Sequence, residues 1–183
     1  MKKIILSFFV LLFLLINNIN SMSTKTKVTL RTWGDYFQIG LILHAYGSVY
    51  SDREALPSLL YHTGTTLGTG YILKGVVNEK RPDYKPGDHR DSFPSGHTFA
   101  AFIGPTFVHQ RYGFWQSLPA YVLASFVGYT RVLAKRHYWH DVIAGAIIPY
   151  ASSLIWIKPY NKKLDIQPEL SSEYKGFQIT YRF

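Results

Sequence analysis

The chain has 183 residues, of which 47% are hydrophobic and 16% aromatic, and this composition predicts one folded domain and excludes a disordered polar chain. There is no cysteine, which excludes disulfide bonds, thiolate metal sites and a cysteine nucleophile. The formal net charge of +9 favours an anionic partner, such as nucleic acid, an anionic membrane surface or an anionic substrate.

Residues 1–23 have the pattern of a secretory signal peptide. Two lysines precede a largely apolar run at 4–16, and the small residues Ser21 and Ser23 follow it. The run is shorter than the about 20 residues that a membrane-spanning helix needs, so an N-terminal anchor is the second interpretation. In either case we expect the rest of the chain to be exported, with a bacterial periplasm as the destination. Export and the lack of a nucleic-acid-binding motif argue against nucleic acid as a partner, and none is expected.

After a polar lead-in at 24–35, five apolar segments have the length and composition of α-helices. A polar loop at 79–92, rich in Arg, Asp, Pro and Gly, separates the second from the third. We predict an all-α domain at residues 24–160, a compact bundle of about five to six helices. The predicted helices are Tyr36–Tyr50, Leu56–Asn78, Thr98–Arg111, Gln116–Leu133 and Trp139–Ile157.

The composition of the predicted helices leaves open whether the domain lies outside a membrane or within it. His62 and several Gly and Thr residues make the second helix a weak candidate for lipid contact, which favours a soluble or peripherally membrane-bound domain. The segments 113–130 and 139–157 are long and largely apolar, and their small residues also suit helix packing within a membrane. Integral membrane helices are therefore the alternative.

The C-terminal tail, residues 161–183, has a different pattern. Apolar and polar residues alternate from Phe177 to Phe183, which is typical of an extended strand. We expect a short strand or extended segment that packs on the domain.

The stretch FPSGHTFAAF, residues 93–102, places a turn directly before an apolar, helix-forming run. The first backbone N–H groups of a helix have no intrahelical partner, and the helix dipole favours an anion there. His97 at this position can donate or accept a proton beside a bound anion. The stretch therefore predicts an anion site with an acid–base residue, in which Ser95 and Gly96 supply donors.

Two further clusters contain residues suited to the same chemistry. Lys74 and Arg81 are seven residues apart, which places them on one face of a helix. Arg131 precedes His137 by six residues, and Asp141 follows His137 by four. Positions i and i+4 are neighbours on a helix, so Asp141 can accept a hydrogen bond from one ring nitrogen of His137. The other nitrogen is then left as a nucleophile or base.

The three clusters, Lys-x6-Arg-Pro, Pro-Ser-Gly-His and Arg-x5-His-x3-Asp, resemble the signature of the PAP2 (type 2 phosphatidic acid phosphatase) superfamily, which includes bacterial acid phosphatases and vanadium haloperoxidases. The resemblance spans residues 74–141, with all three motifs in order. Thr130 stands where the family usually has Ser, and it keeps the hydroxyl group. The resemblance implies a PAP2/haloperoxidase-like helical core.

The resemblance also implies roles for the site residues. His137 would attack phosphorus and form a phosphohistidine, oriented by Asp141, while His97 would protonate the leaving oxygen and then activate water. Because three cations in one pocket would repel a divalent metal ion, we expect neither a metal nor another cofactor. The residues expected to bind phosphate are Lys74, Arg81, Ser95, Gly96 and Arg131.

Several polar residues near the motifs have weaker predictions. The loop residues Asp83, Asp88, His89, Arg90 and Asp91 could gate or select a substrate, but a plain polar loop is the preferred interpretation. His140 is adjacent to Asp141 and is given no catalytic role. Lys135 and Arg136 are expected to be solvated charges or part of a substrate entrance.

We expect a metal-independent phosphatase that hydrolyses lipid phosphate or diphosphate esters on the exported side of the membrane, either soluble in the periplasm or associated with a membrane. Its partners would be a phosphorylated lipid or a small phosphomonoester, together with the membrane surface. Two alternatives stay open: a soluble periplasmic acid phosphatase for small phosphomonoesters, and a non-catalytic phospholipid-binding module. A haloperoxidase is disfavoured because those relatives are far longer.

Overall fold

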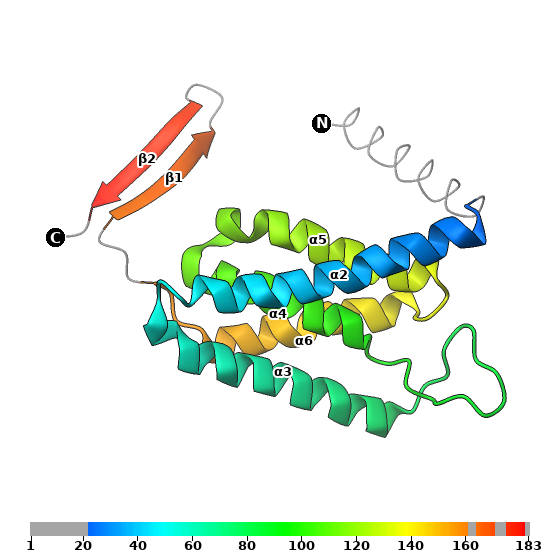
Figure 1. Ribbon diagram of the computed structural model, residues 1–183. Helices are drawn as coiled ribbons and strands as arrows, with labels where there is room; N and C mark the ends of the chain where they lie inside the picture. Colours follow the sequence, from blue (N-terminus) through cyan, green and yellow to red (C-terminus); the bar gives the residue numbers. More distant parts are fainter. Residues whose placement is uncertain (1–21, 161–163, 171–174, 182–183) are drawn as a thin grey trace, which may run out of the picture.

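The computed structural model describes residues 22–160, 164–170 and 175–181 (Figure 1). The predicted signal peptide lies almost wholly outside these ranges, as does part of the predicted tail. The described chain is helical apart from a C-terminal hairpin, so the prediction of an all-α bundle is confirmed.

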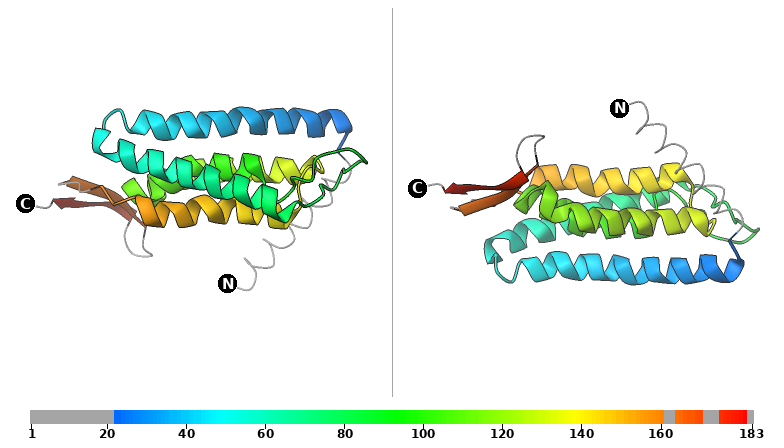
Figure 2. Two further views of the ribbon diagram at one scale, coloured as in Figure 1. Left: turned by 90° about the horizontal axis from the view of Figure 1, so that it is seen from below. Right: turned by 90° about the horizontal axis from the view of Figure 1, so that it is seen from above.

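Within the described ranges, five α-helices and one short 3-10 helix make up the bundle, and each predicted segment overlaps one α-helix. They are α2 (Thr24–Ser48), η1 (Arg53–Ala55), α3 (Leu56–Val77), α4 (Gly96–Tyr112), α5 (Phe114–Leu133) and α6 (Trp139–Trp156). The α-helices run side by side along one axis, and α4 packs against all four others (Figures 1 and 2). Most side chains of α4 between Thr98 and Val108 are consequently buried.

The start of α2 differs from the prediction. The helix begins at Thr24 rather than at Tyr36, so the polar lead-in is helical. The Ser23 hydroxyl caps the helix by accepting a hydrogen bond from the backbone N–H of Thr26 at 3.1 Å. Polar residues are compatible with this helix because its outer face is exposed to solvent. The additional turns bring Asp35 to the end of the bundle where the sequence motifs meet.

Small residues set the distance between the helices of the core. A Cβ atom at Gly104 of α4 would collide with the carbonyl oxygen of Leu41 on α2, so only glycine allows this approach. Around this contact, buried apolar side chains form two clusters. One contains Leu59, Ile103 and Phe107, and the other is built mainly from alanines of α4 and α5 with Leu41 and Val127.

An ion-pair network closes one end of the bundle. The carboxylate of Asp52 accepts hydrogen bonds from Nε and Nη2 of Arg111 at 2.7 and 2.9 Å and from the Tyr112 hydroxyl at 3.0 Å. These bonds from Arg111 hold the pKa of the Asp52 carboxyl below its ordinary value, even though burial opposes this. The network joins the segment after α2 to the C-terminal end of α4, and the motif residues lie at the opposite end.

The outer faces of the helices carry many exposed large apolar side chains. Among the described residues, no helix combines the length and the apolar character that a membrane crossing requires. The most exposed of these side chains, all more than half accessible, include Trp33, Tyr36, Ile39 and Leu43 on α2, Tyr61, Tyr71, Ile72 and Val76 on α3, Trp115 and Val122 on α5, and Ile143, Ile147, Leu154 and Ile155 on α6.

The tail pairs with itself as a hairpin. Strand β1 (Leu164–Leu170) runs antiparallel to β2 (Lys175–Tyr181), with Pro168 opposite Phe177. The strand expected from the alternation is therefore present, but its partner within the tail was not predicted. The hairpin extends from the end of the bundle that lies away from the motif residues (Figures 1 and 2).

Candidate active site

The three sequence motifs converge at one end of the bundle. Lys74 lies in the last turn of α3, which ends at Val77 and is followed by Asn78 in the left-handed conformation (φ 51°). Arg81 lies beyond the helix, so the prediction that Lys74 and Arg81 share one helix face was wrong; both instead contact Asp91. His97 follows the N-terminus of α4, and Arg131 lies near the C-terminus of α5. His137 occupies the turn that leads into α6. The ends of four helices therefore bring together side chains that are far apart in the sequence.

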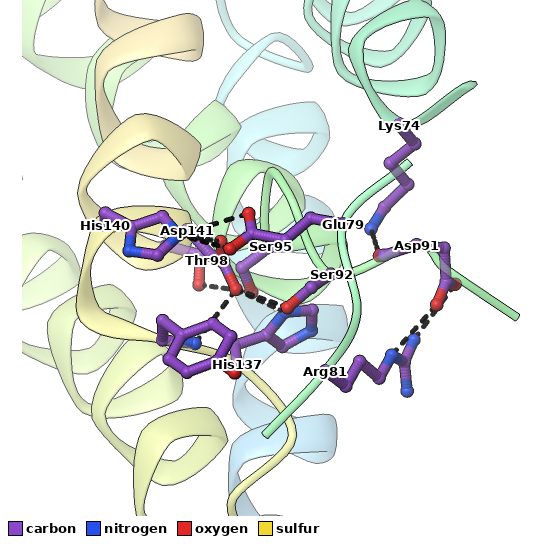
Figure 3. A network of polar contacts seen from close by, with 11 residues as sticks. Lys74, Glu79, Arg81, Asp91, Ser92, Ser95, Thr98, His137, His140 and Asp141 are labelled. Atoms are coloured by element: carbon purple, nitrogen blue, oxygen red, sulfur yellow. Dashed lines mark hydrogen bonds and ion pairs between the residues drawn. The ribbon is translucent and has the colours of Figure 1, made fainter. Parts of the chain in front are cut away.

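The carboxylate of Asp141 is at the centre of a polar network (Figure 3). Its Oδ2 accepts hydrogen bonds from the Ser92 hydroxyl at 2.6 Å and from the Tyr138 backbone N–H at 2.9 Å, and it lies 3.4 Å from Nδ1 of His137. The side chain is fully buried. Burial raises its pKa, but the donors His137, Ser92 and Tyr138 together hold the pKa of Asp141 below its ordinary value. The group is therefore an anion at neutral pH.

His137 faces Asp141 as predicted, but it lies in the turn before α6 and not on one helix with Asp141. Its side chain is only 3% exposed, and Nδ1 faces Asp141. Nε2 is then the nitrogen that can face the pocket, which His137 lines. Burial lowers the pKa of His137, although the contact with the Asp141 carboxylate opposes the change. A neutral imidazole with a fixed tautomer is the form that can act as a nucleophile.

The three predicted cations are each held by oxygen atoms. Arg81 forms a two-pronged contact with the Asp91 carboxylate, with Nε–Oδ1 and Nη2–Oδ2 distances of 2.9 and 3.0 Å. Lys74 donates a hydrogen bond to the backbone carbonyl of Asp91, and burial lowers the pKa of its ammonium group. Arg131 is buried, and its Nη2 lies 2.8 Å from Oδ1 of Asp35. The loop residue Asp91 thus binds Lys74 and Arg81. The interpretation of this loop as a plain polar loop did not predict such a role for Asp91.

His97 lies between the cations and Asp35. Its Nε2 is 3.4 Å from Oδ1 of Asp35, and about half of the side chain is exposed. Desolvation and the positive charge of Arg131 lower the pKa of His97 to about 4, while the Asp35 carboxylate acts in the opposite direction. His97 is therefore neutral at pH 7 when no anion is bound beside it.

Ser95 and Gly96 differ in their access to the pocket. The Ser95 side chain is fully buried, its hydroxyl accepts a hydrogen bond from the Thr98 hydroxyl at 2.9 Å, and its backbone N–H donates to the Asp141 carbonyl at 3.0 Å. Ser95 thus connects the start of α4 to α6. Gly96 and Lys74 both line the larger of the two pockets described next.

Two adjoining pockets share Arg81, His97 and His137. The smaller one, about 120 Å³, is polar and is also lined by Arg31, Asp35, Arg131 and Arg136. The larger one, about 470 Å³, extends between α2, α3 and α4. Besides Gln38, Lys74, Asp91 and Gly96, it is lined by Ile42, Leu67, Tyr71, Phe99 and Ala100. A polar, cationic pocket with two histidines therefore opens directly into an apolar groove.

Sequence reasoning missed the contribution of α2. Asp35 lies in the segment predicted as a lead-in, and it carries no motif that would signal its role. The close approach of α2 to the C-terminal end of α5 depends on Gly34, because a Cβ atom there would lie 2.5 Å from Oγ1 of Thr130 and 2.8 Å from Nη2 of Arg131. Arg136, predicted to be solvated or part of an entrance, lines the small pocket and pairs with Asp83 at 2.9 Å.

The fold and this arrangement of side chains define the class of protein. Residues 55–165 match the family model of the PAP2 superfamily, and the chain belongs to that superfamily. The solved structures it resembles include the crystal structure of Aquifex aeolicus LpxE, with a TM-score of 0.60 and 25% identity, covering 80% of this chain and 92% of that one. A transmembrane PAP2-type phosphatidylglycerolphosphate phosphatase from Bacillus subtilis has the same fold, with a TM-score of 0.55 and 22% identity, covering 75% of this chain and 77% of that one.

Two curated relatives are also similar in sequence. A lipid A 1-phosphatase from Porphyromonas gingivalis is 38% identical over 118 residues, which is 54% of this chain and 26% of that protein. A lipid A 4'-phosphatase from Helicobacter pylori is 31% identical over 134 residues, which is 68% of each chain. The matched region thus spans about a quarter of the first relative and about two thirds of the second.

The tight contact at Gly34 gives a test of the Arg131 position. We expect Gly34→Ala to displace the Arg131 guanidinium and to weaken the binding of inorganic phosphate by about tenfold or more, because a hydrogen bond to a charged group is lost. Isothermal titration calorimetry with phosphate measures the change. Gly40→Ala on the same helix is the matched control, since a Cβ atom there meets nothing within 4 Å. Equal phosphate affinity in both variants would contradict this position of Arg131.

Proposed function

We propose that this chain is a metal-independent phosphatase that hydrolyses phosphate esters of lipids. The observation that carries the proposal is the junction of the two pockets, in which cations and histidines suited to a phosphate group stand at the mouth of an apolar groove. Lys74, Arg81 and Arg131 supply the positive charge that a phosphoryl group in transfer requires. The same three cations disfavour a divalent metal ion in the pocket.

In the first chemical step, each histidine carries a proton with a defined role. Nε2 of His137 attacks phosphorus and forms the P–N bond, while the bond from phosphorus to the leaving oxygen breaks. His97 gives its proton to that oxygen. Asp141 holds the Nδ1 proton of His137 and stabilises the positive charge that develops on the ring. In the second step His97 takes a proton from water, the resulting hydroxide attacks phosphorus, and phosphate leaves His137 neutral.

Substrate binding prepares His97 for this role. With its pKa at about 4 in the pocket without an anion, His97 carries no proton to donate at neutral pH. A phosphate dianion bound beside Arg131 raises the pKa of His97, because the negative charge favours the imidazolium form. Asp35 acts in the same direction as the substrate. The acid is therefore formed mainly when the phosphate group is in position.

The phosphohistidine can be tested by rapid acid-free quenching. We expect brief incubation with a ³²P-labelled phosphate ester to label the protein, with the label stable in alkali and lost in acid. His137→Asn removes the nucleophile, so labelling disappears and turnover falls by more than about a thousandfold. His44→Asn, an exposed histidine on α2, is the control and keeps both. Full labelling of the His137→Asn protein would refute the assignment of the nucleophile.

The apolar groove favours a lipid over a small phosphomonoester. Ile42 and Leu67 line it, and together with the exposed Tyr71 they offer a surface that an acyl chain can cover. A small soluble ester would occupy the polar pocket and leave this groove in contact with water. Both curated relatives bear the name of lipid A phosphatases, so lipid A is the first candidate substrate.

A paired substrate experiment distinguishes the two classes. In the presence of EDTA, we expect Ile42→Asp and Leu67→Asp to lower kcat/KM for a short-chain lipid phosphate, below its critical micelle concentration, by about tenfold or more, because a charge replaces apolar contact. Turnover of p-nitrophenyl phosphate should be unchanged. Leu43→Asp, next to Ile42 but outside the groove, is the control. Equal losses on both substrates, or a wild-type preference for the aryl ester, would favour the acid-phosphatase alternative. Binding of phosphate without any turnover would favour the phospholipid-binding module.

We further propose that the enzyme acts on the exported side of a membrane and contacts its surface. The exposed apolar side chains on α2, α3, α5 and α6 support contact with lipid. The signal-like residues 1–23 support export. Cell fractionation with osmotic shock tests both points, and recovery of the protein in the cytoplasmic fraction would contradict them.

A further inference from the structure

The second oxygen of the Asp141 carboxylate faces away from His137. Whereas Oδ2 meets Ser92, Tyr138 and His137, Oδ1 lies 3.1 Å from Nε2 of His140. Within the described residues, this buried Oδ1 receives no hydrogen bond of good geometry. A buried, anionic oxygen whose nearby imidazole N–H is poorly directed is costly, which indicates that this side of the carboxylate is suited to a further positive partner.

Glu79 completes a cluster around that oxygen (Figure 3). Nε2 of His140 lies 2.9 Å from Oε1 of Glu79 and 3.1 Å from its Oε2. The ligand atoms of Glu79, His140 and Asp141 all lie within 4.8 Å of one another. Nε2 of His140 has one proton and cannot donate it well to two carboxylates. A metal ion in place of that proton can bind the imidazole and both carboxylates at once.

The geometry of the cluster fits a small transition-metal ion. A tetrahedral zinc ion with ligands at about 2.0–2.1 Å separates them by about 3.3 Å, close to the contacts that His140 makes with both carboxylates. The imidazole of His140 is stacked on Tyr138, with ring centroids 5.3 Å apart and the planes at 10°, which fixes its direction. Its side chain is 56% exposed and that of Glu79 is 29% exposed, so an ion can enter from solvent and keep a water molecule as fourth ligand.

We propose that Glu79, His140 and Asp141 bind a divalent transition-metal ion such as Zn²⁺, and that this ion inhibits the enzyme. One imidazole and two carboxylates select zinc-like ions over Mg²⁺ and Ca²⁺, which prefer all-oxygen sites. The site lies on the opposite side of Asp141 from the phosphate pocket, so the proposal leaves catalysis itself metal-independent.

Inhibition follows from the shared carboxylate and rests on the proposed function. A metal ion on Oδ1 withdraws negative charge from Asp141, which then stabilises the developing charge on His137 less well. The positive charge of the ion also disfavours the positive charge that develops on His137. Because Glu79 precedes Arg81 by two residues, the ion also links the loop of the first motif to the first turn of α6.

Metal binding is tested directly, without reference to turnover. The EDTA-treated full chain is titrated with Zn²⁺ in competition with a chromogenic chelator. We expect one tight equivalent, and His140→Ala and Glu79→Gln should each weaken it by about tenfold or more. His89→Ala, an exposed histidine in the neighbouring loop, is the matched control and should bind as the wild type does. Unchanged affinity in the His140→Ala and Glu79→Gln proteins would overturn the site, whatever the activity of the chain.

Inhibition is measured with p-nitrophenyl phosphate, whose phenolate product does not bind zinc strongly. We expect Zn²⁺ to inhibit the wild type and the His89→Ala protein in parallel with site occupancy, and excess EDTA to restore activity. The His140→Ala protein should require at least about tenfold more Zn²⁺. Full turnover with the site occupied would overturn the coupling to catalysis. A chain that binds zinc but shows no basal turnover would count against the proposed function and not against the site.

Discussion

The active-site end of this protein depends on the burial of one carboxylate. Asp141 has no exposed surface, and an ion in such a position is tolerated only when donors surround it. Ser92 and the backbone N–H of Tyr138 supply two of them, and Ser95 is tied to the Asp141 carbonyl. The same hydrogen bonds that stabilise one charge therefore hold the long loop, the start of α4 and the turn before α6 together, and His137 is oriented as a result.

The cations of the pocket likewise need partners of opposite charge or oxygen acceptors around them. Arg81 and Arg131 each carry a carboxylate partner, Asp91 and Asp35, and Lys74 is bonded to a carbonyl oxygen. The partners keep the guanidinium groups in position before substrate arrives, which reduces the entropy lost on binding. They also lower the net positive charge of the pocket. A weakly charged anion gains little by competing with them, so the pairing favours a phosphate dianion as ligand.

The sequence predicted the parts of the site that depend on short-range spacing. The contact between His137 and Asp141 and the turn before α4 join residues close in the chain, although His137 lies before α6 and not on it, and the five helices follow from long apolar segments separated by polar breaks. Asp35 could not be found in this way. Its contact with Arg131 joins positions that are far apart in the chain, and a single acidic residue in a polar helix start has no periodic signal. The hairpin was missed for a different reason: its two strands are close in the chain and both alternate, but Pro168 in the first strand argues against a strand interior.

Helix α2 lies outside the family match but contributes to both pockets. The family match begins at residue 55, after α2 has ended, and it contains all of the motif residues. Yet α2 supplies Asp35 beside His97 and one wall of the apolar groove through Ile42. The small pocket thus combines motif residues with Arg31 and Asp35 of α2, and the apolar groove combines Ile42 of α2 with residues of α3 and α4. Because Ile42 lies two helical turns beyond Asp35, a substitution at the groove end of α2 can alter the apolar wall while Gly34 and Asp35 keep their contacts with Arg131.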